Sequence, residues 1–426
     1  PSKEAAAGRR QRRIDIARRG AGKQVELAES LRTSIRMPTR AETPGAYKNK
    51  EPTPTKENVD RVTGQVREMA CTELAYQIIT DLNANILVLS TAILSSLILL
   101  HRSTGVSVEV LASHCPWVID QLKLRGARVD EPKEGQELEY VDRGLSLLSE
   151  HIHVANSVVE VVAQSPASEV LDKRYGTVQD INSLTYLAIL RNQMMHLFSE
   201  DGLVFAAFSA CATAPDRSRL EADYADVLAE VAFLRQLFAK EFALRPASGL
   251  DADRERMADD MIGHARFLNI LYKTDSHEEA GVTRDTLFTK VGSESTEMLH
   301  GFLGSMVMPF LETYWFATLL CSVWISRRPH PYRRAQAHIC WLAKRFLQVG
   351  HLRYAECANS VSIGFALDSL VSLGLLTRNR DLLSVGDTAL PLERVTNRLA
   401  HLAWHTDDHA TIRGFVEKFP LVPSRL

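Results

Sequence analysis

Residues 184–208 read LTYLAILRNQMMHLFSEDGLVFAAF, a largely apolar run that we interpret as helical. Arg191, Asn192 and His196 lie in the middle of it. An unpaired charge in a protein interior costs several kcal/mol. Arg191 must therefore have a partner, reach solvent at the end of an element, or serve a site.

Helical periodicity extends to both sides of this run. Val227, Val231, Leu234 and Phe238 form one apolar stripe, which Phe242 and a stop at Pro246 follow. A second spacing predicts an amphipathic helix through Leu145, Leu148, Ile152, Ala155 and Val159. The predicted fold class is mainly α, with many helices.

One local pattern differs from the helical background. A helix that ends near Ser372 runs into Gly374, the turn-forming residues RNRD (378–381) and LLSV (382–385). This order predicts a small β-hairpin in a winged-helix-like unit near the C-terminal end, a shape used for DNA binding and for protein docking. Because residues 357–372 contain Asp368 and no Lys or Arg, docking or a purely structural role is favoured over DNA binding.

Three apolar stretches raise the question of membrane insertion, namely 86–100, 202–214 and 314–325. Each is shorter than the ~20 residues that cross a bilayer core. Buried helices are therefore favoured over membrane spans, and peripheral membrane contact stays open.

Composition excludes several classes of function. The net charge is −2 and 45% of the residues are hydrophobic, so no large single-sign field attracts a polyanion such as nucleic acid. The six cysteines lack CxxC and Cys/His spacing, which argues against a zinc site or a disulfide framework. They are Cys71, Cys115, Cys211, Cys321, Cys340 and Cys357.

Several segments resemble the C-terminal region of the glycerol-3-phosphate and dihydroxyacetone-phosphate acyltransferases. The motif Arg191-Asn192-x-x-x-His196-x-Phe198 is one of them, and residues 73–100 resemble the helix pair that follows the catalytic domain in that family. The resemblance covers roughly residues 70–385. Later blocks are FLRQLFAKEFALRP (233–246), LHGFLGSMVMPFLETYW (299–315) and FALDSLVSLGLLT (365–377), and the last two lean towards the dihydroxyacetone-phosphate branch.

The resemblance implies an enzyme that transfers a fatty acyl group from acyl-CoA to a hydroxyl of the acceptor, with no cofactor or metal. The family's chemistry lies in an upstream domain, where a His-x-x-x-x-Asp dyad supplies the general base and the residue that orients it. Of the 14 histidines, His196 alone has an Asp five positions later, Asp201, in HLFSED.

The sequence around this pair argues against catalysis, because the family's Phe-Pro-Glu-Gly-type loop and its Arg-bearing phosphate block are missing. We therefore expect Arg191, Asn192 and His196 to be structural, with Asp201 in a turn before Gly202, and no catalytic residue in this chain. The candidate pair His196 and Asp201 is the alternative.

The amino-terminal segment agrees with a missing upstream domain. Between Lys3 and Lys23, eight Lys or Arg face only Glu4 and Asp15, a net charge of 8 − 2 = +6. A solvated linker is favoured, and binding to anionic phospholipid or nucleic acid is the alternative. We predict a basic, Pro-containing linker at 1–60, a helical domain at 61–250 and a helical subdomain at 251–426.

The last three residues, Ser424, Arg425 and Leu426, match the small-basic-Leu peroxisomal address. An import receptor would read this tail, and the protein would be peroxisomal or glycosomal and membrane-associated. Within the resemblance, dihydroxyacetone phosphate is the expected acceptor, delivered together with acyl-CoA to the missing domain. Glycerol 3-phosphate is the alternative acceptor, and a non-catalytic helical scaffold is the alternative from another class.

Overall fold

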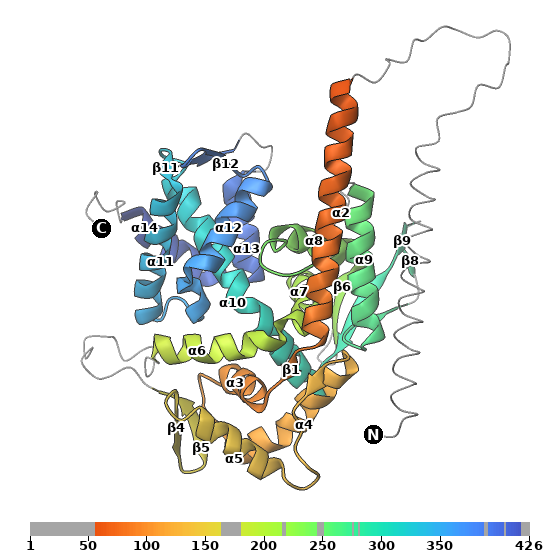
Figure 1. Cartoon of the computed structure of the whole chain (residues 1–426), viewed down its shortest axis with the longest axis vertical. Coiled ribbons are helices and arrows are strands. Elements are labelled where there is room, and N and C mark those ends of the chain that lie inside the picture. Colours follow the sequence, from red (N-terminus) through yellow and green to blue (C-terminus); the bar gives the residue numbers. More distant parts are fainter. Residues whose placement is uncertain are drawn as a thin grey trace, which may run out of the picture. The chain divides into compact units, whose positions relative to one another are not determined.

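The computed structural model describes residues 56–162, 180–214, 219–244, 251–274, 277–279, 282–386, 391–403 and 406–418. Contacts between residues divide the chain into two units, Pro1–Thr63 and Gly64–Leu426, and the account below concerns the second. The predicted mainly α fold is confirmed (Figure 1). The predicted division at residue 250 stays a prediction.

The helices are α2 (Lys56–Ala84), α3 (Ser90–Leu100), α4 (Val108–Leu124), α5 (Glu137–Leu147), α6 (Ile181–Arg191), η3 (Asn192–Met194), α7 (Met195–Cys211), α8 (Tyr224–Leu237), α9 (Asp251–Phe267), α10 (Glu294–Trp324), α11 (Tyr332–Gln348), η4 (Ala355–Ala358), α12 (Ser360–Ser372), α13 (Leu392–Leu402) and α14 (Thr406–Lys418).

The strands are β1 (Leu87–Val88), β2 (Val106–Ser107), β3 (Arg128–Val129), β4 (Ile152–Ala155), β5 (Val158–Val161), β6 (Arg219–Asp223), β7 (Tyr272–Lys273), β8 (His277–Glu279), β9 (Val282–Arg284), β10 (Thr286–Lys290), β11 (His330–Pro331), β12 (Leu376–Asn379) and β13 (Leu382–Val385).

Polar side chains fix several helix starts. Ser107, Asp223, Ser293 and Asn359 each accept a hydrogen bond from a backbone N–H in the first turn of the helix that follows. Such caps satisfy donors that have no partner inside the helix, typically for about 1 kcal/mol each. The stripe Val227, Val231, Leu234 and Phe238 is buried along α8 and just after it, as its spacing predicted.

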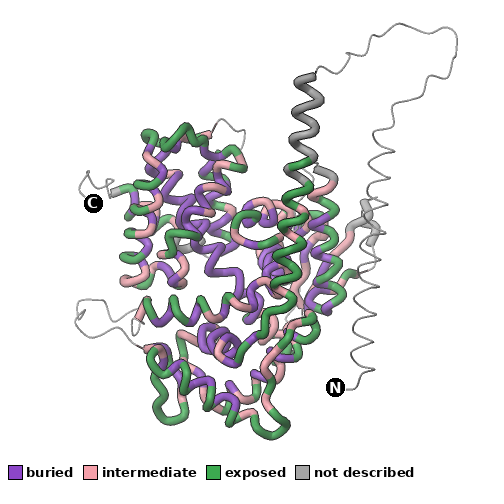
Figure 2. The backbone as a smooth tube through the Cα atoms, viewed as in Figure 1, coloured by how far each residue is buried: buried purple, intermediate pink, exposed green. Residues whose placement is uncertain are grey.

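Helix α10 forms the centre of the core. It packs against α3, α7, α11, α12, α13, α14 and η4. Among the described helices, α10 alone is long and apolar enough to cross a membrane, yet 94% of its apolar window is buried inside the protein. Figure 2 shows the same contrast, with α10 and α7 mostly buried and residues 70–84 of α2 largely exposed. The predicted stretch 314–325 is thus the last third of a much longer helix and its C-cap, and the protein itself covers it.

Gly202 brings α7 and α10 together. A Cβ atom at this position would overlap Cγ2 of Val307. The expectation that Asp201 lies in a turn before Gly202 is therefore wrong, because both residues lie inside α7. The glycine serves helix packing there and does not end the element.

The helix expected through Leu145, Leu148, Ile152, Ala155 and Val159 is wrong, because only Leu145 of these residues lies in a helix. Helix α5 ends at Leu147, and β4 pairs with β5 in an antiparallel hairpin. Its turn residues Asn156 and Ser157 have φ values of 50° and 61°, the left-handed conformation that two-residue hairpin turns require.

The predicted C-terminal hairpin is confirmed, and it belongs to a three-stranded sheet in the order β11-β13-β12. Helices α11 and α12 lie between the first and second of these strands in the chain. This order of elements is that of a winged-helix unit. Arg380, at the hairpin turn, has a φ of 56°.

Candidate functional site

The motif residues lie where three short elements join. Helix α6 begins at its cap Asp180 and ends at Arg191, η3 tightens the chain over Asn192–Met194, and α7 follows. This single tight turn directs neighbouring side chains to different places. Arg191 lines one cavity, whereas Asn192 and His196 line another.

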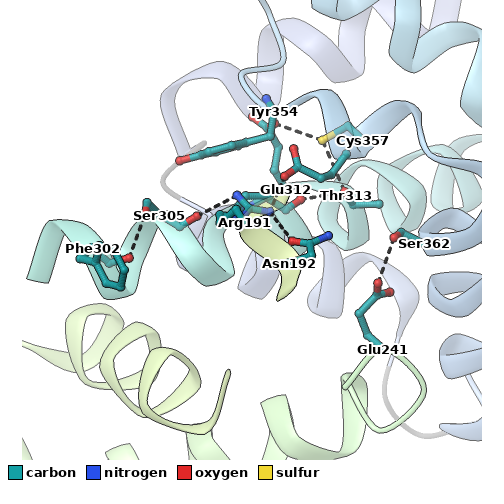
Figure 3. A network of polar contacts seen from close by, with 12 residues as sticks. Arg191, Asn192, Glu241, Phe302, Ser305, Glu312, Thr313, Tyr354, Cys357 and Ser362 are labelled. Atoms are coloured by element: carbon teal, nitrogen blue, oxygen red, sulfur yellow. Dashed lines mark hydrogen bonds and ion pairs between the residues drawn. The ribbon is translucent and has the colours of Figure 1, made fainter. Parts of the chain in front are cut away.

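Arg191 is buried, with a side-chain exposure of 2%. Its Nη2 donates to Oε1 of Glu356 at 2.6 Å and to Oδ1 of Asn192 at 2.9 Å. Its Nη1 donates to the backbone carbonyl of Ser305 at 3.3 Å (Figure 3). The guanidinium therefore joins the end of α6 to η4 and to the middle of α10.

The Ser305 carbonyl is available because Pro309 lies four residues further along α10. In a regular helix the N–H of residue i+4 would bond to this carbonyl, but proline has no N–H. Arg191 supplies the missing donor. The motif arginine thus compensates a proline that lies more than 100 residues away.

Glu312 makes the second half of this network from the next turns of α10 (Figure 3). Its fully buried carboxylate accepts from the backbone N–H groups of Arg353 and Tyr354 at 2.9–3.0 Å and from Cys357 Sγ at 3.1 Å. Burial first, and the neighbouring Glu312 charge second, raise the pKa of the Cys357 thiol. Together Arg191 and Glu312 hold the segment from Arg353 to Cys357 against α10.

The first cavity, of about 980 Å³, opens beside this segment. Its lining includes the guanidinium groups of Arg102, Arg191 and Arg353, the imidazole rings of His153 and His300, and the carboxylate of Glu160. The Arg102 guanidinium lies 4.0 Å from the centre of the Tyr354 ring. Apolar residues complete the wall, including Leu100, Ile152 and Met308. Such a lining suits an anionic group attached to an apolar segment.

The second cavity, of about 620 Å³, contains the candidate catalytic pair in its wall. The Nε and Nη2 groups of Arg125 both donate to Oδ2 of Asp201, at 2.8 and 2.6 Å, and each side chain is 3% exposed. The Nη1 group donates to the backbone carbonyl and to Oε1 of Gln121. The other oxygen of Asp201, Oδ1, lies 3.2 Å from Nδ1 of His264. Asp201 is therefore bound to Arg125 and His264.

His196 has different neighbours. It hydrogen-bonds to the backbone of Gln193 and Asn83, and burial lowers its pKa. The spacing of His196 and Asp201 in the sequence thus does not lead to a His–Asp pair among the contacts of the described residues.

His264 was not singled out by sequence reasoning. It lies in α9, 63 residues from Asp201, and no local pattern marks it. The hydrogen bond to Asp201 raises its pKa, and about half of its side chain is exposed to the cavity. A carboxylate at Nδ1 is how a triad orients its histidine, but here Arg125 already neutralises that carboxylate.

Comparison with known protein families shows to which family the chain belongs. Residues 42–379, more than half of the chain, match the family described as the glycerol-3-phosphate acyltransferase C-terminal region. The chain belongs to this family. No curated protein matches it.

The match to the glycerol-3-phosphate acyltransferase C-terminal region confirms the family predicted from the motif and the later blocks. It covers both cavities, Arg191 and the whole Glu312 network, and it ends at the last residue of β12. Ser424, Arg425 and Leu426 lie beyond it and outside the described residues.

Proposed function

We propose that this chain is the C-terminal helical part of an acyltransferase that moves a fatty acyl group from acyl-CoA to the hydroxyl of dihydroxyacetone phosphate, an early step of ether-lipid and glycerolipid synthesis. The observation that carries the proposal is the family match over residues 42–379. The resemblance of residues 299–315 and 365–377 to the dihydroxyacetone-phosphate branch supports the choice of acceptor.

The proposed role of the chain is to support catalysis without supplying the reacting groups. Asp201 is held by Arg125 and His264, so it does not orient His196 for general-base work. Arg191 likewise uses its guanidinium to join α6, η4 and α10. These contacts favour a folded platform for the family's catalytic domain.

Two observations support alternative functions, and the acyl-transfer experiment below includes both. The description of the matched family names glycerol 3-phosphate, which makes it the second candidate acceptor. His196 and Asp201 each bind other residues of the chain and not one another. This favours a non-catalytic helical scaffold as the alternative to an enzyme.

The location follows as a further part of the proposal. Ser424, Arg425 and Leu426 fit a receptor that reads a small residue, a cation, an apolar residue and a carboxylate. We infer import into peroxisomes or glycosomes. A fluorescent protein fused to the amino-terminal side should be imported, and deletion of the three residues should leave it in the cytosol. Unaltered import after the deletion would contradict this address.

Acyl transfer from labelled palmitoyl-CoA tests the enzymatic proposal. We expect the purified 426-residue chain to acylate neither acceptor. Joined to the coding sequence that precedes it, the same chain should acylate dihydroxyacetone phosphate faster than glycerol 3-phosphate. The reverse preference would select the second acceptor, and inactivity of both proteins would select the scaffold. If the chain alone were active and His196→Ala abolished this activity, His196 and Asp201 would be the catalytic pair after all.

A further inference from the structure

Six arginines gather at one end of the winged-helix unit, and we call them the arginine surface. Arg327 and Arg328 follow α10, Arg333 and Arg334 open α11, and Arg378 and Arg380 lie on the hairpin. The backbone N–H of Tyr332 bonds to the carbonyl of Asp381 at 2.6 Å, which joins the start of α11 to the hairpin turn. The Arg378 guanidinium lies 4.0 Å from the centre of the Tyr332 ring.

Two acidic residues lie near these arginines, Asp368 in α12 and the exposed Asp381 in the hairpin turn, against six guanidinium groups. Among the described residues, Arg378 alone of the six makes an ion pair, with Asp368 at 3.7 Å. All six are exposed, while the chain as a whole carries a net charge of −2. The arginine surface is therefore a strong local positive field on a nearly neutral protein.

The stability of the fold does not explain this arrangement. Arg333 and Arg334 lie in the first turn of α11, which contains no acidic residue and whose cap, Pro331, makes no side-chain cap hydrogen bond. The amino-terminal end of a helix is itself positive, so arginines are disfavoured there. An anionic partner outside the chain would offset both the helix end and the repulsion between arginines.

We propose that the arginine surface docks the protein on the anionic phospholipid surface of a membrane. Basic side chains near an anionic leaflet each gain attraction, and the gains accumulate over a cluster. Leu382, opposite Pro331 in the sheet and next to the hairpin turn, is 49% exposed and supplies an apolar side chain at the same place. An exposed apolar side chain close to basic ones suits the interface of a bilayer.

The same surface does not suit a DNA duplex. In a winged-helix unit the second of the two helices enters the major groove. Here that helix is α12, which contains no Lys or Arg and presents Val361, 57% exposed, together with Asp368. The six arginines lie instead in the connection after α10, at the start of α11 and on the hairpin, and a flat anionic surface is the better partner for them.

Vesicle flotation with the whole 426-residue chain tests the proposal. We expect binding to vesicles of phosphatidylcholine mixed with phosphatidylserine and none to phosphatidylcholine alone, with loss of binding at high salt. The double variant Arg333→Glu/Arg334→Glu should weaken binding at low salt by at least roughly 30-fold. Because acidic residues suit the start of a helix, these substitutions should preserve the fold.

The matched control is Arg128→Glu/Lys133→Glu, which makes the same change of charge at two exposed residues outside the winged-helix unit. It should bind within about twofold of the original chain, because these side chains are outside the docking surface. An equal loss in both variants would overturn the proposal, since it would show an effect of net charge alone.

Unchanged binding by Arg333→Glu/Arg334→Glu would also overturn it. A parallel variant that neutralises the eight basic residues between Lys3 and Lys23 would then identify the amino-terminal segment as the contact. Tighter binding to a random DNA duplex than to the anionic vesicles would overturn the assignment to lipid.

Discussion

Arg191 donates a hydrogen bond to the carbonyl of Ser305, an acceptor that Pro309 leaves without its helical partner. The motif arginine and the proline of α10 are thus coupled, although they lie on different helices. The coupling gives the motif a physical meaning that can be measured.

Arg191→Ala should lower the free energy of unfolding by about 3–5 kcal/mol, because it leaves Glu356 without its buried partner. Urea unfolding followed by circular dichroism measures the change. An unaltered midpoint would contradict the structural role of the arginine.

Pro309→Ala supplies an N–H to the Ser305 carbonyl. The substitution should therefore stabilise the Arg191→Ala protein more than it stabilises the original chain, by about 1 kcal/mol. A double-mutant cycle measures the difference. Strict additivity would show that the two residues act independently.

Asp201→Ala should cost about 3–5 kcal/mol of unfolding free energy, since it leaves Arg125 buried and unpaired. The combined substitution Arg125→Met/Asp201→Leu removes both charges, and we expect it to recover most of this loss. His264→Ala, at a half-exposed side chain, is the control and should change stability little. A smaller loss of unfolding free energy in Asp201→Ala than in His264→Ala would contradict this prediction.

Gly202→Ala should destabilise the protein by about 1–3 kcal/mol, because the new methyl group overlaps Val307. Val307→Ala removes the atom that is in the way. The double variant should be more stable than the sum of the two single changes predicts, and thermal unfolding measures this. Full tolerance of Gly202→Ala would mean that α7 and α10 are further apart than described.

His300 should make the protein sensitive to acid. Burial lowers the pKa of His300 to about 4, from an ordinary value of 6.5. Between these two values the unfolded chain binds a proton that the folded chain does not. The unfolding free energy should therefore be highest above pH 6.5, as far as His300 is concerned, and should fall as the pH drops towards 4. His300→Gln removes the group that titrates. The unfolding free energy of this variant should therefore fall less over the same pH range. If the unfolding free energies of the two proteins changed equally with pH, the lowered pKa of His300 would be contradicted.

Local sequence patterns predicted much of the fold. The stripe from Val227 to Phe238 became α8 and its end, because helical spacing and burial coincide there. The C-terminal hairpin followed from a turn-forming segment between two short apolar runs. The hairpin of β4 and β5 was missed because its apolar residues also fit a helical spacing. The left-handed pair Asn156 and Ser157 decided between the two, and Asn-Ser is an ambiguous turn signal.

The partners of the site residues were beyond the reach of such patterns. Glu356 lies 165 residues from Arg191 in the chain, and Arg125 lies 76 residues from Asp201. The sequence indicated that Arg191 needed a partner, since burial of its charge followed from its apolar neighbours. Which carboxylate would meet it depends on how α6, α10 and η4 pack, and this is a property of the whole core.

The central position of α10 has a consequence during synthesis. Helices α3 and α7 leave the ribosome long before residue 324, the end of the helix that covers them. At about 5–20 residues per second, the interval between the end of α7 and the end of α10 is on the order of ten seconds. Throughout that time the apolar faces of α3 and α7 that pack on α10 lack this cover, and transiently exposed apolar surface makes a nascent chain prone to aggregation.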